Sequence, residues 1–189
     1  RQMTDTERFF RIEMEDQPLA YEPGQFVGVT MFGVGEAPIS ICSSPTQGET
    51  FELTVRHVGS VTNAMKDIGE GDRLGIRGPY GNHFPYEEMK GSNILFVAGG
   101  LGLAPTRSIL RYVLDKREEF GDVQILVGAR EPKLLLFRDE IDAWVERDDA
   151  ETLVTVDRPS DDWGGNTGVI TKLCRHIDID AADTWAVIV

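Results

Sequence analysis

The sequence predicts two domains, an antiparallel β-barrel over residues 1–86 and an α/β domain with a parallel sheet over residues 87–189. Two observations support this division. Up to about residue 84, short β-rich segments alternate with turn signals, which is typical of a small antiparallel barrel. From about residue 92, continuous apolar segments alternate with segments of helical periodicity, which is typical of a parallel sheet with crossover helices.

The first half reads as short strands around one helix. RFFRIEME and TFELTVRHV alternate between apolar and polar residues, and turn signals such as EPGQ, TQGET and GEGD separate the segments. SVTNAMKDI is the helical insert. We expect strands over residues 8–15, 24–32, 38–44, 50–58 and 72–79, and a helix over residues 60–68.

The second half follows the turn-rich segment GPYGNHFPYEEMKG, which we interpret as the connection between the domains. NILFVAGG and DVQILVGA are continuous apolar strands, and the segment between them places Ile109, Leu110, Val113 and Leu114 at helical spacing. We expect strands over residues 93–100, 122–129, 151–157 and 184–189, with helices over residues 104–120, 135–147 and 168–177.

Composition excludes several classes of protein. The formal net charge of −13 argues against a nucleic-acid-binding protein, which needs a basic face to replace counterions. The longest apolar stretch is shorter than the roughly 20 residues that span a bilayer, so we expect no transmembrane segment. Cys42 and Cys174 lie far apart and form no CxxC motif, so this chain alone predicts no metal site. A reducing, cytoplasmic location fits best.

The segment LFVAGGLGLAP resembles a phosphate-binding turn. Gly99, Gly100 and Gly102 follow a predicted strand, and Pro105 stands where a helix tolerates a missing N–H. Glycines there would keep Cβ atoms away from a pyrophosphate, and the helix start would offer N–H groups to it. The pattern lacks the full GxGxxG fingerprint, so a tight turn that binds nothing stays an alternative.

A second turn of this kind, VRHVGSVTNAM, lies in the barrel half. Gly59 ends a predicted strand, and Ser60 or Thr62 is suited to cap the helix that follows. The start of a helix beside a barrel is again a candidate anion site, and an ordinary capped helix is the alternative. The presence of one such turn in each half favours a ligand that carries phosphates.

The order of these motifs resembles the ferredoxin–NADP reductase-like superfamily. PISICSSP, VRHVGSVTNAM, GPYGNHF, VAGGLGLAP and LVGARE follow one another as in that family, over nearly the whole chain. The resemblance is strongest to flavin-carrying electron-transfer subunits, namely the gamma subunits of NiFe hydrogenases and sulfhydrogenases and the electron-transfer subunit of dihydroorotate dehydrogenase. It implies a flavin-binding barrel that holds FAD and an α/β domain that holds NAD(P).

The resemblance also implies which residues contact the cofactors. The Ser40 hydroxyl would lie near flavin N5, which makes Ser40 the candidate catalytic residue, and Ile39 stands where the family has a Tyr. The residues implied at the flavin are Pro38, Ile39, Ser40, Arg56, His57, Val58, Gly59, Ser60, Val61 and Thr62. The nicotinamide nucleotide would lie on Gly99, Gly100, Leu101 and Gly102.

Two further residues are candidates because they follow strands of the predicted parallel sheet. Arg130 could meet the adenosine ribose or a 2′-phosphate, and an exposed loop Arg is the alternative. Asp157 could contact a ribose hydroxyl, and a turn-forming Asp before Pro159 is the alternative. Only Arg130 and Lys133 are available near a 2′-phosphate, with Glu131 between them, so we expect a preference for NADH over NADPH.

Function and partners follow from the same resemblance. It implies a subunit that passes electrons between NAD(P)H and the iron–sulfur and catalytic subunits of a redox complex. It also implies a [2Fe–2S] centre in a C-terminal segment beyond Val189. Ala37 and Leu101 depart from the family's usual Arg and Thr, which supports one rival, a structural or docking module that has lost its cofactors. A free-standing flavin reductase is the other rival.

Overall fold

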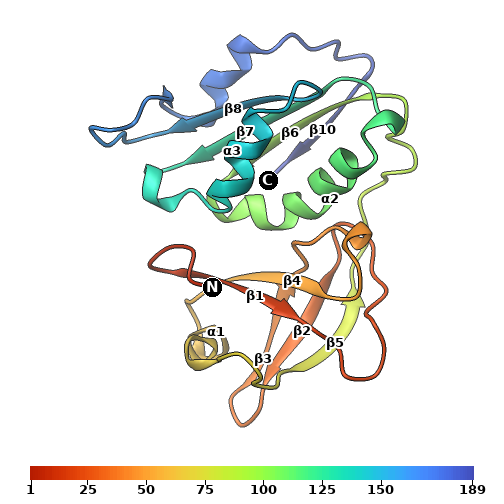
Figure 1. The fold of residues 1–189 in the computed structure, drawn as a ribbon, viewed down its shortest axis with the longest axis vertical. Coiled ribbons are helices and arrows are strands. Elements are labelled where there is room, and N and C mark those ends of the chain that lie inside the picture. Colours follow the sequence, from red (N-terminus) through yellow and green to blue (C-terminus); the bar gives the residue numbers. More distant parts are fainter. The chain divides into compact units, whose positions relative to one another are not determined.

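The computed structural model describes residues 1–189, which form two compact units (Figure 1). The first unit contains Arg1–Phe84 and Arg107–Tyr112, and the second contains Pro85–Thr106 and Val113–Val189. None of the helices is long and apolar enough to cross a membrane.

The first unit is an antiparallel β domain, as the sequence predicts. Strand β2 lies at the centre of a three-stranded sheet of order β3-β2-β5, and β1 pairs with β4 in a second sheet. A single bridge between Ile41 and Leu53 links the β3 side to β4, so the barrel is not closed by continuous ladders. Its strands are β1 (Glu7–Ile12), β2 (Phe26–Met31), β3 (Gly35–Ser40), β4 (Phe51–Arg56) and β5 (Gly75–Tyr80).

Strand β4 departs from the predicted half-exposed pattern. Its apolar residues pack in the core of the unit, as the alternation predicts, but Glu52 and Thr54 on the opposite face are buried as well. Residues Arg107–Tyr112 of the chain belong to this unit, and Arg107 contacts Glu52 directly. The polar face of β4 is therefore an interior surface rather than a solvated one.

A short helix follows β4. Helix α1 (Ser60–Ala64) begins after Gly59, and a 3-10 turn (Met65–Asp67) continues it, so the α-helix is shorter than the predicted helical segment. A second 3-10 turn (Pro45–Gln47) follows β3 and is capped by the Ser44 side chain.

The second unit contains the predicted parallel sheet. Its strand order is β10-β6-β7-β8-β9, and every neighbouring pair is parallel. The strands are β6 (Asn93–Gly99), β7 (Val123–Ala129), β8 (Glu151–Val156), β9 (Asn166–Thr167) and β10 (Thr184–Ile188). Helix α2 (Leu103–Asp115) follows β6 and α3 (Arg138–Val145) follows β7, so strands and helices alternate along the chain.

Two elements differ from the sequence-based expectation. The segment expected as a helix over residues 168–177 contains a 3-10 helix (Ile170–His176) instead. Strand β9 was not predicted, because it has only two exposed polar residues and therefore no apolar pattern. Smaller 3-10 turns cover Gly100–Gly102, Arg117–Glu119 and Pro132–Leu134.

Candidate functional site

The PIS segment (residues 38–40) is part of β3, which is an edge strand of the three-stranded sheet. Pro38 pairs with Gly28 and Ser40 pairs with Phe26, both on β2. An edge position suits Pro38, since proline cannot donate to a sheet ladder. Side chains alternate along a strand, so Pro38 and Ser40 share one face, while Ile39 packs against the core. Ile39 therefore lines the interior with most of its side chain, and Ser40 presents its hydroxyl on the other face.

The turn after β4 is shaped by Thr62. The Thr62 hydroxyl oxygen accepts the N–H groups of Val58 and Gly59 at 3.1 and 3.0 Å, and it lies 3.3 Å from the Gly59 carbonyl, to which it donates. Gly59 is the N-cap of α1. Of the two residues proposed to cap α1, Ser60 therefore does not occupy the N-cap, and Thr62 reaches back from the third helical position. Thr62 thus organises the turn, and its hydroxyl is already engaged.

The same turn has room on its open side. A Cβ atom added at Gly59 would find no neighbour closer than the Thr62 hydroxyl oxygen, at 4.0 Å. Helix α1 lies beside β3, since a Cβ at Gly35 would meet the Val61 side chain at 3.3 Å. Helix α1 therefore lies beside the first residue of the strand that ends at Ser40.

His57 carries an unsatisfied polar atom in this region. Its side chain is only 8% exposed, and Nδ1 is hydrogen-bonded to the Thr62 carbonyl oxygen. A carbonyl only accepts, so Nδ1 must carry the proton. Nε2 is buried and has no hydrogen-bond partner in the chain. Buried polar atoms are normally paired, so a partner outside the chain, such as a bound cofactor, is the natural explanation.

Arg56 is held by Glu7, the first residue of β1. Its Nε donates to the carboxylate of Glu7, which also accepts from Thr4 and Thr6. Burial alone would raise the pKa of Glu7, but these hydrogen bonds outweigh burial and hold the pKa below its usual value. Arg56 is therefore a fixed cation at the end of β4.

The glycine turn after β6 forms an open cradle. Cβ atoms added at Gly99 or Gly100 would meet nothing within 4 Å, and Gly100 has φ of +55°. Gly102 is different, because a Cβ there would lie 2.7 Å from the carbonyl oxygen of Val189, just after β10. Gly99 and Gly100 thus leave room for a ligand, whereas Gly102 permits close packing within the unit. Leu101 is half-buried between them.

Arg130 and Asp157 lie at the carboxyl ends of strands of the parallel sheet, as Gly99 does. Gly99 pairs with Gly128 at the carboxyl end of β7, and the Asp157 N–H donates to the Ala129 carbonyl at 3.0 Å. Both candidate side chains are exposed. Ligands of doubly wound sheets bind outside the carboxyl ends of the strands, so this edge fits a nucleotide.

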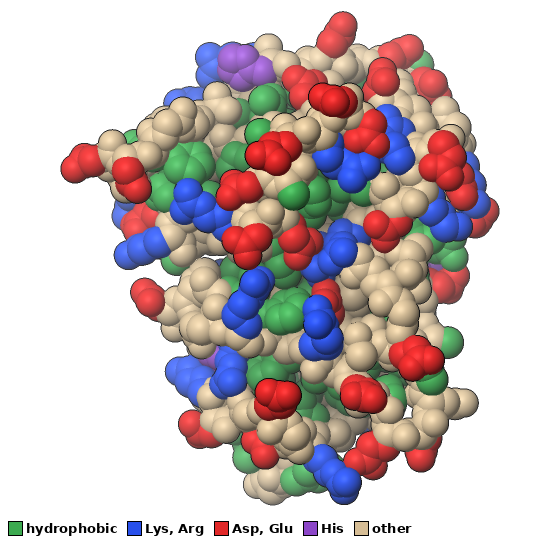
Figure 2. Space-filling model, in the orientation of Figure 1, with side chains coloured by type: hydrophobic (Ala, Val, Ile, Leu, Met, Phe, Trp, Pro, Cys, Tyr) green, Lys and Arg blue, Asp and Glu red, His purple; other side chains and the backbone are tan.

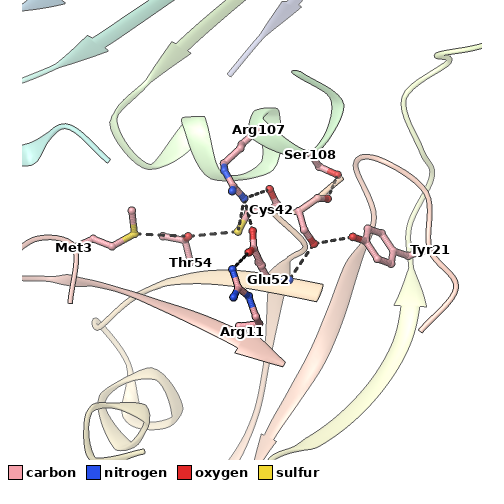
Figure 3. A network of polar contacts seen from close by, with 9 residues as sticks. Met3, Arg11, Tyr21, Cys42, Glu52, Thr54, Arg107 and Ser108 are labelled. Carbon is pink, nitrogen blue, oxygen red and sulfur yellow. Dashed lines mark hydrogen bonds and ion pairs between the residues drawn. The ribbon is translucent and has the colours of Figure 1, made fainter. Parts of the chain in front are cut away.

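A buried polar network in the first unit was missed by sequence reasoning (Figure 3). Arg107 Nη1 donates to the Cys42 carbonyl at 2.7 Å and pairs with Glu52 at 2.8 Å, and Arg11 pairs with the other oxygen of Glu52 at 3.0 Å. The Ser108 hydroxyl donates to the Ser43 carbonyl at 2.6 Å.

Tyr21 closes the network at the Ser43 side. Its hydroxyl lies 2.7 Å from the Ser43 hydroxyl oxygen, which accepts the N–H of Glu52 at 2.9 Å. Burial raises the pKa of Tyr21 to about 12, and the Ser43 hydrogen bond offsets part of this rise. Tyr21 is therefore a neutral hydrogen-bonding group at any physiological pH.

Profiles of two protein families match the chain. The family described as Oxidoreductase FAD-binding domain matches residues 3–86, and the family described as Oxidoreductase NAD-binding domain matches residues 96–189. The first match covers the PIS segment and the Gly59 turn, and the second covers the glycine turn after β6, Arg130 and Asp157.

Two curated relatives align with most of the chain. Sulfhydrogenase 1 subunit gamma of Pyrococcus furiosus is 42% identical over 172 residues, which cover 88% of this chain and 59% of the relative. A probable dihydroorotate dehydrogenase B (NAD(+)), electron transfer subunit, of Methanocella arvoryzae is 33% identical over 177 residues, which cover 93% of this chain and 60% of the relative. The chain thus spans about three fifths of the length of these relatives.

Solved structures share the fold. A ferredoxin NADP+ reductase from Neisseria gonorrhoeae, determined with bound FAD and NADP, matches with a TM-score of 0.79 over 98% of this chain and 80% of that chain. The two sequences are 20% identical, so this likeness concerns the fold alone. The fold of this chain is an antiparallel β domain followed by a parallel five-stranded α/β domain.

Proposed function

Because the chain belongs to the ferredoxin–NADP reductase-like family of FAD- and NAD-binding oxidoreductases, we propose that it is the flavin-carrying electron-transfer subunit of a multisubunit redox complex. It passes electrons between NAD(P)H and an iron–sulfur partner. The observation that carries the proposal is the pair of turns, one in each unit, where Gly59 and Gly99 leave open the space a Cβ would fill. The relatives named above are themselves subunits by name.

The residues of the first unit fit FAD. The open Gly59 turn and the first N–H groups of α1 suit phosphate oxygens, since such groups have no partner within the helix. His57 Nε2 offers a buried hydrogen-bonding atom beside them, and Ser40 presents a hydroxyl on the neighbouring strand. When bound, the flavin supplies the ring that takes up a hydride and releases electrons singly.

The chain itself orients the reactants. No strong acid or base is required of it, since the cofactors carry the chemistry. Ser40 holds a hydroxyl for the flavin nitrogen at which a hydride arrives, Thr62 fixes the turn for the phosphates, and Gly99 and Gly100 allow the backbone to approach the nicotinamide nucleotide. A [2Fe–2S] centre, the partner subunits and a cytoplasmic location all stay predictions.

Two rival functions make different predictions. Ala37 and Leu101, which depart from the family's usual residues, favour a docking module without cofactors, and such a protein would be colourless when folded. A free-standing flavin reductase would turn over NADH rapidly with free flavin or oxygen as acceptor. Extraction of the bound cofactor from the purified protein tests the docking module, and turnover of NADH by the purified protein alone tests the free-standing reductase. We expect FAD, and FMN alone or no flavin would contradict the proposal.

Ser40→Ala is expected to lower the limiting rate of flavin reduction about tenfold, because it removes one hydrogen bond close to the reacting nitrogen. The side chain is half-buried at a sheet edge, so folding should change little. Stopped-flow reduction under anaerobic conditions measures the rate, and thermal unfolding measures the stability. Thr171→Ala is the control, because it removes an exposed hydroxyl at a residue outside the proposed site. An unchanged rate in Ser40→Ala would remove Ser40 from the reaction.

NADH is expected to reduce the flavin at least about tenfold more efficiently than NADPH, because a 2′-phosphate needs charge-assisted partners. Efficiency here is the limiting rate of flavin reduction divided by the Kd for the nucleotide. The Glu131 carboxylate, beside Arg130, lies 3.4 Å from Lys133 and 3.9 Å from Arg158, so it already pairs with two of the nearby cations. Figure 2 shows acidic side chains interspersed with basic ones over the second unit, so the face in view has no broad basic surface to attract an extra phosphate. Glu131→Gln should reduce the preference for NADH over NADPH. If NADPH instead reduces the flavin more efficiently than NADH, and if Arg130→Ala abolishes that advantage, the expected preference is wrong and Arg130 binds the 2′-phosphate.

A further inference from the structure

The segment that follows Ser40 passes from the β2 side to β4 and enters the interior of the first unit. Strand β3 ends at Ser40; the Ile41 N–H donates to the Gln25 carbonyl at 3.1 Å, which continues the pairing next to β2, and the Cys42 N–H donates to the Glu52 carbonyl of β4 at 2.9 Å. Cys42 and Ser43 are fully buried. Their carbonyls lie outside any strand ladder and therefore need partners, since a buried unpaired carbonyl is costly.

Two adjacent side chains supply those partners. Arg107 donates to the Cys42 carbonyl, and Ser108 donates to the Ser43 carbonyl (Figure 3). Both donors belong to the same unit as the segment they hold. Glu52 completes a ring, because its carboxylate pairs with Arg107 while its backbone carbonyl accepts from Cys42. The backbone after Ser40 is thus fixed from both sides.

The choice of Arg at this position is informative. Arg107 is only 1% exposed, and a buried ion pair generally stabilises a protein no better than apolar side chains of similar volume. An apolar residue could fill the space but could not donate to Cys42. Arg107 Nη1 donates to the Glu52 carboxylate and to the Cys42 carbonyl at once, and the nitrogen of the shorter Lys side chain would end one bond earlier. The ion pair of Arg107 with Glu52 therefore fixes the position of the backbone at Cys42.

We propose that Arg107 is a positioning residue for Ser40: with Ser108 it holds the Cys42 and Ser43 carbonyls and thereby sets where the Ser40 hydroxyl lies relative to the flavin. This inference rests on the proposed function, because Ser40 matters only if a flavin is bound. Arg107 itself touches neither cofactor in this account. A small displacement of a reacting geometry lowers a rate strongly, so the effect is measurable.

The test is a double-mutant cycle between Arg107→Lys and Ser40→Ala. Lys keeps a positive charge near Glu52, but its side chain is one bond shorter, so its nitrogen falls short of the position from which Arg107 Nη1 reaches the Cys42 carbonyl. We expect Arg107→Lys to lower the limiting rate of flavin reduction by NADH about tenfold in the wild-type background and less than about twofold in the Ser40→Ala background, with the Kd for NADH unchanged. Ser108→Ala, a smaller change, should act in the same direction if Arg107→Lys does not fold.

A second readout needs no cofactor. Hydrogen exchange of the flavin-free protein should show faster exchange at the Ile41 and Cys42 amides in Arg107→Lys and Ser108→Ala than in wild type. Arg11→Gln is the control, because Arg11 pairs with the same Glu52 carboxylate from the exposed side and does not contact the segment. It should change neither the rate nor this exchange.

The outcomes separate the two claims. Equal rate losses in both backgrounds, or an unchanged rate in every Arg107 and Ser108 variant that folds, would overturn the positioning role while the proposed function stands. A folded wild-type protein that takes up no flavin would refute the proposed function and, with it, this inference.

Discussion

Gly99→Val is expected to lower the efficiency of flavin reduction by NADH, which is the limiting rate divided by Kd, about 100-fold while leaving the fold intact. Gly99 has φ of −110° and ψ of 124°, which any residue adopts, and a Cβ there meets nothing within 4 Å. The new side chain would instead occupy the space through which a pyrophosphate approaches the backbone. A 100-fold loss corresponds to about 2.7 kcal/mol of interaction free energy. Stopped-flow flavin reduction at several NADH concentrations measures it.

The other glycines of this turn provide the contrast. Gly102→Ala would place a Cβ 2.7 Å from the Val189 carbonyl oxygen, so it should lower thermal stability whether or not a ligand binds. Gly100 has a positive φ, so a larger residue there would strain the backbone as well as fill the cradle. Gly99 alone separates ligand binding from folding. A Gly99→Val protein that is folded and reduced at the wild-type rate would show that no nucleotide passes over this turn.

Glu52→Gln is expected to lower the free energy of unfolding by about 3–5 kcal/mol, because it leaves the buried Arg107 guanidinium without its counter-charge. Urea denaturation at neutral pH measures the loss. Arg11→Gln removes the second, exposed cation from the same carboxylate and should cost less than about 1 kcal/mol. Equal losses in the two variants would mean that burial of the Arg107 pair contributes nothing special.

The same pair predicts a dependence of stability on pH. Burial alone would raise the pKa of Glu52, but the charge and hydrogen bond of Arg107, with those of Arg11, outweigh it and lower the pKa. A carboxyl with a lowered pKa in the folded state stabilises the protein above the usual value of 4.5, and this contribution is lost as the pH falls through the folded-state pKa. The urea midpoint should therefore fall less steeply below about pH 4.5 in Glu52→Gln than in wild type.

Local patterns were sufficient to predict the order of the main strands, of α2 and α3, and the positions of both glycine turns. Gly99 and Gly59 stand at strand ends before helical segments, so their surroundings are close in sequence. Arg107 could not be identified in that way. A polar residue within a helical pattern normally indicates a solvated face, and its partners Cys42 and Glu52 lie 65 and 55 residues away. The burial of Glu52 was equally unpredictable from the sequence, because an alternating strand predicts that its polar positions are exposed.

Other differences also depend on contacts that local patterns do not predict. The Ile170–His176 segment contains apolar residues at helical spacing, and yet it forms a 3-10 helix; its Ile170 packs close to Gly128 on β7, where a Cβ would lie 3.0 Å from the Ile170 Cβ. The role of Thr62 in its own turn was also not predictable, since a Thr at that position suits either a ligand contact or the backbone contact that the structure contains.

The measurement that tests the central claim most directly is anaerobic reduction of the FAD-loaded protein by NADH, followed through the absorbance of the oxidised flavin. The account predicts uptake of FAD by the folded chain, complete bleaching, and a rate that saturates with NADH concentration. A folded protein that binds FAD but is bleached by neither NADH nor NADPH would contradict the claim that this chain passes electrons between nicotinamide and flavin.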